Sequence, residues 1–86
     1  MLNLKWNPLK SERLKKTRGV SFDEITKSKL IDIMKHPKNK LQSMMLFEYK
    51  GYIWVVPFVQ GEKEIFLKTL YPSRKYTKIY YKKEGK

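Results

Sequence analysis

The segment from residue 52 to residue 59 constrains the fold most, because it is apolar at almost every position. Alternate residues of a β-strand point to opposite faces of a sheet, so a strand of this composition needs cover on both sides. One face would carry Tyr52, Trp54, Val56 and Phe58, and the other Ile53, Val55 and Val59. Helices, a partner or a ligand must therefore lie on each face of the sheet that contains this strand.

Similar segments flank this strand, and short turns separate the three. Residues 44–49 precede it across a Lys-Gly pair, and residues 64–71 follow it after a Gln-Gly pair. Glycine in a two-residue connection between apolar runs is typical of a β-hairpin. The pattern therefore predicts a three-stranded antiparallel meander.

A helix is predicted near the N-terminus, between two residues that mark its ends. Asn7 followed by Pro8 provides an N-cap and then proline at the first helical position, where its missing N–H breaks no helical hydrogen bond. Gly19 suits the left-handed conformation in which many helices end. We expect a helix between Pro8 and Gly19, after a short extended segment with apolar residues at positions 2, 4 and 6.

A second helix is predicted to start at Ser21. Ser21 and Glu24 have the spacing of a capping box, in which each side chain binds the backbone N–H of the other residue. Apolar residues at positions 22, 25, 30 and 33 continue the helical periodicity towards Met34, with charged residues between them. Residues 36–40, which include a proline and two lysines, then predict an exposed loop.

The C-terminal segment alternates basic and aromatic residues from Arg74 to Lys83, and it predicts a short helix or an added strand. The two helices can cover only one face of the sheet. This segment, a partner or a substrate that stacks on aromatic rings must cover the other face. We expect a single α+β domain over residues 1–86, with two N-terminal helices packed on an antiparallel sheet of three to four strands and a short basic and aromatic C-terminal segment.

The net charge of +12 is the strongest signal in the composition. Such a field attracts polyanions and makes their binding fall with salt, so a nucleic acid or an acidic protein is the expected partner. A lysine-rich surface that serves solubility alone would have the same composition. The absence of cysteine, of an apolar run of about 20 residues and of a signal peptide favours the cytoplasm and gives no indication of membrane insertion.

The sequence offers cations and phenols rather than the usual catalytic groups. One histidine and no cysteine cannot supply a catalytic zinc site, and there is no P-loop, dinucleotide-binding turn or nucleophile elbow. We therefore expect no metal and no cofactor. Metal-free RNA cleavage needs proton removal from the 2′-hydroxyl, stabilisation of a charged phosphorane and protonation of the leaving oxygen, and Arg, Lys and Tyr can share these tasks.

The candidate site lies in the basic and aromatic residues near the C-terminus. We predict that Arg74, Lys68 and Tyr80 are catalytic and that the RNA-binding residues are Lys75, Lys78, Tyr71, Tyr76 and Lys82. An ion pair with a carboxylate is the structural alternative for Arg74.

Other residues have both a catalytic or binding interpretation and a structural one. His36 is the one side chain that titrates near neutral pH without a special environment, but it stands in the predicted loop. Glu48 and Glu64, near strand ends, could act as a base or be solvated. Aromatic residues of the meander could stack bases or belong to the core: Tyr52, Trp54, Phe58 and Phe66.

Both ends of the sequence resemble a known family, the BrnT-type toxins of type II toxin–antitoxin systems. Residues 6–8 and 18–24 (Trp-Asn-Pro and Arg-Gly-Val-Ser-Phe-Asp-Glu) are similar to the family's Trp-Asp-Pro opening and Gly-Val-Ser-Phe-Glu-Glu helix start. Ser-Arg-Lys at 73–75 with Thr-Lys at 77–78 is similar to the family's Ser-Ala-Arg-Arg-Ala-Thr-Arg ending. Tyr76 stands where the family usually has a small residue.

The resemblance implies a RelE-like ribonuclease fold and a toxin that cleaves mRNA, free or on the ribosome, and thereby inhibits translation. It also implies a cognate DNA-binding antitoxin that neutralises the toxin, with operator DNA contacted only through that antitoxin. The resemblance supports Arg74 best, whereas Lys68 rests on its strand position alone. A non-catalytic module that binds RNA or DNA and a basic subunit that binds an acidic protein are the alternatives.

Overall fold

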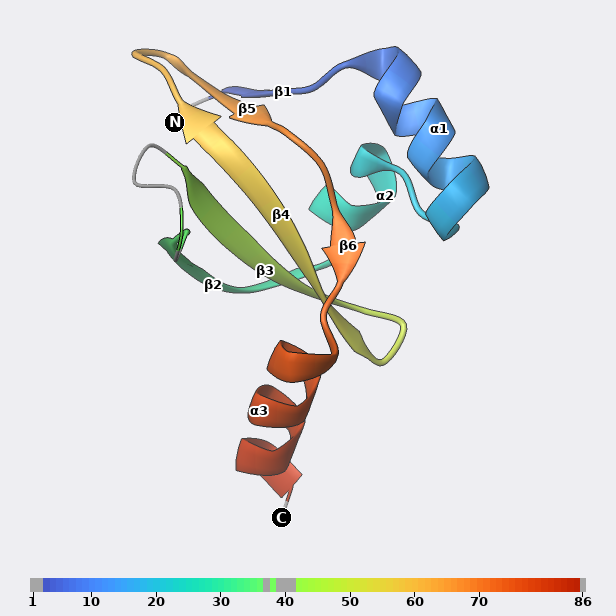
Figure 1. Ribbon diagram of the computed structural model, residues 1–86, viewed down its shortest axis with the longest axis vertical. Helices are drawn as coiled ribbons and strands as arrows, with labels where there is room; N and C mark the ends of the chain where they lie inside the picture. The colour runs from blue at the N-terminus through green and yellow to red at the C-terminus, as the bar shows by residue number, and fades with distance from the viewer. Residues whose placement is uncertain (1–2, 37, 39–41, 86) are drawn as a thin grey trace.

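The computed structural model describes residues 3–36, 38 and 42–85, with only the backbone described for residues 82–85. The elements follow the chain in the order β1 (Asn3–Lys5), α1 (Pro8–Arg18), α2 (Phe22–Thr26), β2 (Lys29–Lys35), β3 (Ser43–Tyr49), β4 (Tyr52–Gln60), β5 (Glu64–Leu67), β6 (Tyr71–Pro72) and α3 (Arg74–Gly85). Helices α1 and α2 lie together on one face of the sheet, and α3 extends away from one end of the sheet (Figure 1). The chain is therefore an α+β fold with N-terminal helices, a sheet and a C-terminal helix.

The sheet is mixed and has six strands, with β4 at its centre. Its order is β1-β5-β4-β3-β2, and β6 also pairs with β4. The pairs β2·β3, β3·β4 and β4·β5 are antiparallel, whereas β1 is parallel to β5. The predicted meander is confirmed, but the prediction of an antiparallel sheet of three to four strands is wrong, because β1, β2 and β6 extend the meander.

The last strand of the meander is interrupted between β5 and β6. Leu67 and Leu70 are both buried in the same core cluster, although they are separated by an odd number of positions. A regular strand would point these two side chains to opposite faces, so the chain must leave the strand conformation between them. The predicted continuous strand over residues 64–71 is therefore two short strands.

The two ends of α1 and the start of α2 were predicted correctly. The Asn7 side chain accepts hydrogen bonds from two backbone N–H groups of α1 at 2.9 and 3.3 Å. Gly19 ends α1 in the left-handed conformation, with φ of 84°. The capping box between Ser21 and Glu24 is present in full.

The second helix ends at Thr26 instead of continuing towards residue 34, and residues 29–35 form β2. A β-bulge between Leu30 and Asp32 explains why the sequence suggested a helix. Leu30 pairs with Phe47 and Ile33 pairs with Met45, and both of these β3 residues face α2. The extra residue of the bulge therefore puts two side chains three positions apart on the same face of β2. The spacing of three between Leu30 and Ile33, which suggested a helix, is caused by the bulge.

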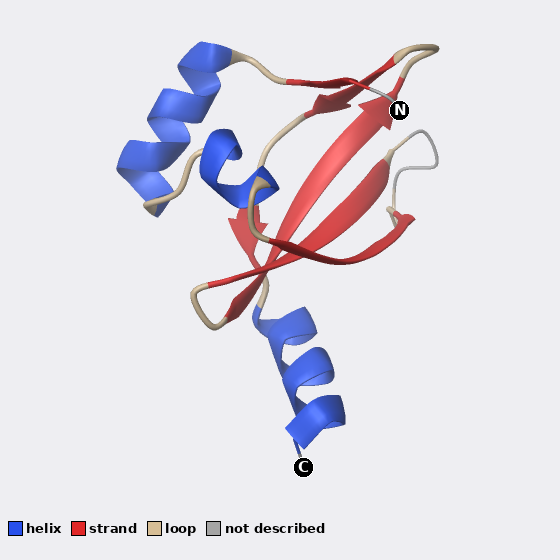
Figure 2. Ribbon diagram, turned by 180° about the vertical axis from the view of Figure 1, so that it is seen from behind, coloured by secondary structure: helices blue, strands red, loops and turns tan. Residues whose placement is uncertain are grey.

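Both faces of β4 are covered, as its composition required. The cluster on the side of α1 and α2 consists of Leu14, Val20, Phe22, Ile25, Met45, Phe47, Val56, Phe58, Leu67 and Leu70. The cluster on the other side consists of Met44, Leu46, Ile53 and Val55, with Ile31, Met34, Tyr71, Tyr76 and Tyr80 packed against it. In Figure 2, which views the molecule from behind, α1 and α2 lie on the near side of the sheet and α3 lies below them. The C-terminal segment is therefore the helix among the predicted options, and it covers part of the second face.

We predict that Leu70→Ala destabilises the fold by about 2–5 kcal/mol, because it leaves a cavity at a fully buried position. Leu9→Ala is the matched control, since Leu9 is 70% exposed on α1 and its truncation should change stability by less than about 0.5 kcal/mol. Urea unfolding measures both variants. Equal effects would contradict the assignment of Leu70 to the core.

Candidate nucleic-acid interface

Hydrogen bonds around Ser73 and Thr77 fix the start of α3 to β4. The Ser73 N–H donates to the Ile53 carbonyl, and the Ile53 N–H donates to the Thr77 hydroxyl oxygen, both at 2.9 Å. The Thr77 hydroxyl donates in turn to the Ser73 carbonyl at 2.6 Å. The Ser73 hydroxyl also accepts the N–H of Tyr76 at 3.1 Å. The first turn of α3, which begins at Arg74, is therefore held in one position against the sheet.

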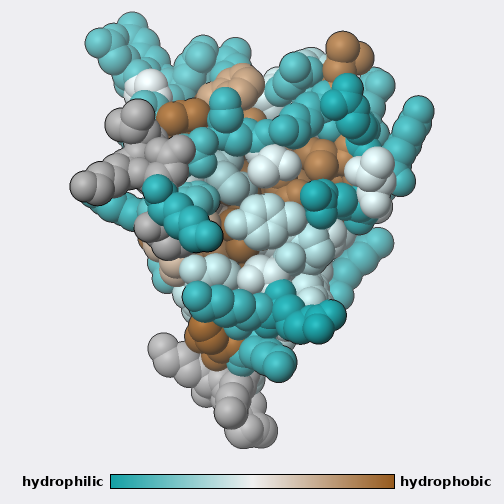
Figure 3. Space-filling view, viewed as in Figure 1, coloured by the Kyte–Doolittle hydropathy of each residue, from teal (hydrophilic) through white to brown (hydrophobic). Residues whose placement is uncertain are grey.

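Exposed cations gather on the outer side of α3. Arg74, Lys75 and Lys78 are exposed, at spacings of one, three and four that keep them within about one turn. In the described part of the chain the ion pairs are Lys5–Glu64 and Lys15–Glu24, so Arg74 has no carboxylate partner there. Hydrophilic side chains cover most of the view in Figure 3 and surround paler and apolar patches. These cations are available to phosphate groups.

The tyrosines of this region face the sheet. Tyr71, Tyr76 and Tyr80 pack against the core cluster of the second face, and the Tyr80 hydroxyl donates to Asp32 at 3.0 Å. Burial raises the pKa of Tyr80, and the hydrogen bond to Asp32 raises it further. Burial also raises the pKa of Tyr71. Both phenols therefore keep their protons at neutral pH and can act as donors, not as bases.

Lys68 lies where β5 ends. Its ammonium group is 5.5 Å from the centre of the Phe66 ring. The backbone N–H of Lys68 donates to the carbonyl of Pro57, whereas the backbone N–H of Ser73, just before α3, donates to the carbonyl of Ile53. Four residues of β4 separate these two acceptors, which corresponds to about 13 Å along the strand.

The structure thus brings only some of the predicted site residues together. Arg74, Lys75 and Lys78 share the start of α3, Lys68 lies further along the sheet, and the Tyr80 hydroxyl points to β2. Only the backbone of residue 82 is described, so the predicted role of the Lys82 side chain lies outside the described part of the structure. The catalytic and RNA-binding assignments remain predictions.

The weaker candidates are mostly engaged in structural contacts. The backbone N–H of His36 donates to the carbonyl of Gln42 at 3.0 Å, and the Nδ1 atom of the His36 ring accepts the backbone N–H of Lys38 at 3.1 Å. Positions 37, 39 and 40 of the predicted loop lie outside the described residues. Glu48 accepts a hydrogen bond from the Tyr81 hydroxyl at 2.8 Å, and Glu64 pairs with a lysine of β1.

The aromatic residues of the meander divide into core and surface. Phe58 is buried, and Trp54 packs against the core on the side of α1 and α2, with its ring edge-on to Tyr49. Tyr52 is half-buried. Phe66 differs from the others, because 41% of it is exposed on the opposite face. Phe66 is therefore the aromatic residue of the meander best placed to meet a ligand.

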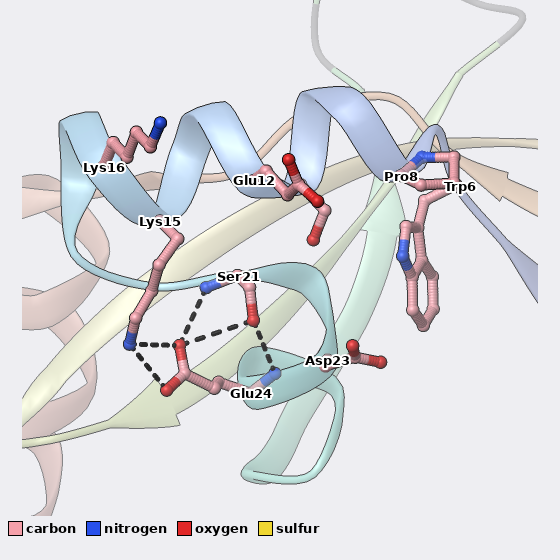
Figure 4. Close-up of a pocket in the computed structure, with 9 residues that line it drawn as sticks. Trp6, Pro8, Glu12, Lys15, Lys16, Ser21, Asp23 and Glu24 are labelled. Carbon is pink, nitrogen blue, oxygen red and sulfur yellow. Dashed lines mark hydrogen bonds and ion pairs between the residues drawn. The ribbon is translucent and has the colours of Figure 1, made fainter.

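A hollow of about 550 Å³ lies between α1 and α2 (Figure 4). Lys15 donates to both carboxylate oxygens of Glu24 at 2.7 and 2.9 Å, and the Ser21 N–H donates to the same carboxylate at 3.0 Å. The hydrogen bond from Lys15 lowers the pKa of Glu24, and the same contact raises the pKa of Lys15. Lys15 and Glu24 satisfy each other, so this pair joins the two helices and is not itself a free acid or base.

Two other kinds of site have no support in the described residues. No three His, Asp or Glu side chains lie together there as a metal ion would require. None of the helices in the same ranges is long and apolar enough to cross a bilayer. The exposed basic surface at the start of α3 is the candidate site that both the charge and the geometry favour.

No protein-family model matches the sequence, and no curated protein matches it. The structure, however, resembles the ribonuclease toxin BrnT of Brucella abortus, whose crystal structure was determined at 1.1 Å resolution. The TM-score is 0.56, over 85% of this chain and 97% of that chain. This chain has the BrnT fold. The sequence identity with BrnT is 16%, so the likeness establishes the fold, and it confirms the resemblance to BrnT seen in the sequence.

The role of Ser73 and Thr77 in anchoring α3 of this BrnT fold was not predicted. The signal was a serine followed four residues later by threonine at the start of a helix-compatible segment. The hydrogen bond between Asp32 and Tyr80 was also not predicted, because Asp32 was expected in a helix and Tyr80 is distant from it in the sequence.

We predict that Thr77→Val destabilises the fold by about 1–3 kcal/mol, because it leaves the Ile53 N–H without its acceptor. Thr17→Val is the matched control: the Thr17 hydroxyl bonds only to a carbonyl of its own exposed helix turn, so a smaller effect is expected. Urea unfolding compares the two. An equal loss in both variants would contradict the anchoring role of Thr77.

We predict that stability falls above about pH 10 partly through Tyr80. The folded-state pKa of Tyr80 is raised, so its stabilising contribution is fully present below the ordinary tyrosine pKa of about 10 and is lost as pH rises through the raised value. Tyr80→Phe cannot ionise and should lose less stability than the wild type over about pH 9 to 12. Parallel pH profiles of the unfolding free energy would contradict this role.

Proposed function

We propose that this chain is the toxin of a type II toxin–antitoxin pair and that it cleaves mRNA without a metal ion, which inhibits translation. The BrnT fold carries this proposal, because the Brucella protein with this fold is a ribonuclease toxin. We also propose that the fold is related to that of the RelE ribonucleases, as the resemblance of the sequence implies. The net charge of +12 supports an RNA substrate.

In this proposal, Arg74 stabilises the charged phosphorane. Its guanidinium group is exposed at the first position of α3, where the helix dipole adds positive potential. Lys75 and Lys78 bind neighbouring phosphates from the same turn. Lys68, whose backbone lies about 13 Å away along β4, remains a proposed catalytic cation that contacts the RNA phosphates.

Tyr80 is the proposed proton donor to the leaving 5′-oxygen, and the proton of the attacking 2′-hydroxyl passes to water. A tyrosine carries its proton at neutral pH, and burial raises the pKa of Tyr80 further above that range. Its hydroxyl is bonded to Asp32, so it has to leave that carboxylate before it can protonate RNA. Tyr71 and Tyr76 are half-buried beside it and are proposed to line the bound RNA.

The proposed partner is a cognate DNA-binding antitoxin in the cytoplasm, through which the complex reaches operator DNA. An acidic surface on the antitoxin would complement the cations of α3 and exclude RNA from them. Neutralisation then needs no change of fold in the toxin.

A module that binds RNA without cleaving it is the second candidate. The observation that favours it is that, in the described part of the chain, the carboxylates bonded to α3 are those of Asp32 and Glu48, and both already accept hydrogen bonds from phenols. Proton transfer would require these bonds to open, whereas binding would not. A basic subunit for an acidic protein remains the third option, and the surface of α3 fits it equally well.

We predict that induction of the wild-type chain in bacteria arrests growth and fragments mRNA, and that Arg74→Ala loses most of both effects. Loss of one charged contact to the transition state typically lowers cleavage by about 10²–10³-fold. Arg13→Ala is the matched control, because Arg13 is exposed on α1 and its replacement removes the same charge far from the start of α3 in the fold.

Growth, RNA integrity and the amount of folded protein are measured for all three chains. Arrest that persists in Arg74→Ala at equal abundance would remove Arg74 from the site. Salt-sensitive RNA binding without cleavage or arrest would select the binding module instead.

A further inference from the structure

Helix α3 covers only part of the second face of the sheet. Its start is tied to Ile53, and the strand before it pairs Tyr71 with Val55. Further along β4, Val59 lies opposite Phe66 on the same face. In Figure 1 this part of β4 and β5 lies at the top of the molecule, and α3 leaves from the bottom. Accordingly, 41% of Phe66 is exposed.

Lysines flank the exposed Phe66 ring. The Lys68 ammonium lies over the Phe66 ring, 5.5 Å from its centre, and Lys5 of β1 lies directly beside Phe66 in the sheet. Because the Lys68 side chain is exposed, it can move aside when a base stacks on that face of the ring. The carboxylate of Glu64 lies on the same face, and Lys5 pairs with it at 3.9 Å. Glu62 is the other acid of this end of the sheet, and Lys63 stands next to it in the turn. The neighbourhood of the ring is therefore not acidic, although it includes two carboxylates.

The same arrangement recurs at the start of α3. The Lys75 ammonium is 5.6 Å from the centre of the Tyr76 ring. Tyr71 lies between the two pairs along the chain and points to the same face as Phe66, since their partners Val55 and Val59 are an even number of positions apart. An aromatic ring with a lysine therefore occurs at each end, with a third ring between them.

The spacing of this row fits a short run of nucleotides. Phe66 and Tyr71 pair with residues of β4 that are four positions apart, which corresponds to about 13 Å. A stacked strand rises about 3.4 Å per nucleotide, so roughly four nucleotides cover that distance. Phosphates could then lie beside the lysines while bases stack on the rings.

We propose that Phe66 and Lys68 form a base-stacking subsite for an unpaired nucleobase of single-stranded RNA, at the far end of a track that begins at Arg74. Proteins that bind single strands commonly combine a cationic surface with aromatic rings, since every base offers a π-face. A duplex already stacks its bases internally and cannot use such a ring. The choice of RNA rests on the proposed function, but the subsite does not require cleavage.

The test measures binding of a fluorescent 2′-O-methyl RNA of about eight nucleotides, which cannot be cleaved through its 2′-oxygen and is long enough to span the track. Phe66→Ala should raise the dissociation constant roughly 10-fold or more. Phe66→Leu should bind as weakly as Phe66→Ala, because it keeps an apolar side chain without a ring. Phe66→Tyr should restore binding, which separates stacking from a general effect on folding.

Ile33→Ala is the matched control. Ile33 is 54% exposed on a strand but faces the side of α1 and α2, so its truncation should leave RNA binding unchanged. A dinucleotide is too short to join the two ends, so Phe66→Ala should alter its binding less than that of the longer RNA. A single-stranded DNA of the same base sequence tests whether the subsite recognises the base alone. If it does, the Phe66 variants should weaken binding of the DNA as they weaken binding of the RNA.

Three results would overturn the subsite: equal affinity of Phe66→Ala and the wild type, equal affinity of Phe66→Leu and Phe66→Tyr, or no RNA binding by the wild type. These results are separate from the test of toxin activity. Growth arrest that depends on Arg74 with no effect of Phe66 on binding would reject the subsite and keep the toxin. Binding that depends on Phe66 without RNA cleavage or arrest would keep the subsite and reject the ribonuclease.

Discussion

The burial of β4 on both faces is the constraint on which the rest of the structure depends. Ile53, Val55 and Val56 are each no more than 1% exposed, although they point to different sides of the sheet. Burial of such side chains is the main favourable term in folding, and leaving one face open to water would forfeit much of it. The N-terminal helices supply one cover and α3 supplies part of the other. This division explains why a small chain places helices at both its ends.

Helix α3 combines two tasks that usually belong to different elements. Its inner side completes the core through Tyr76 and Tyr80, and its outer side presents Arg74 and its neighbouring lysines. The hydrogen bonds at Thr77 and Tyr80 determine the position of the cations, because a rigid helix transmits its anchoring to every residue on it. A change in the packing of α3 would therefore affect both stability and the basic surface.

The sheet edges and the charge distribution limit how this chain can associate with itself. The N–H of Ile33 in the edge strand β2 donates to the Asp32 side chain at 2.8 Å instead of to another strand, and Lys29 and Lys35 are exposed at the ends of β2. Both features oppose the addition of another strand. With a net charge of +12, copies of the chain also repel one another, whereas polyanions are attracted.

The sequence by itself determined what depends on short-range chemistry. The caps at Asn7, Gly19 and Ser21, the meander and the two-sided burial of residues 52–59 could be predicted, because each rests on neighbouring residues or on a simple period. The basic character of the C-terminal segment and its resemblance to BrnT were also visible. Tertiary structure decided the rest. The strand β2, the break after Leu67 and the contact of Tyr80 with Asp32 depend on a bulge, a shared core and residues 48 positions apart, and no local pattern encodes these.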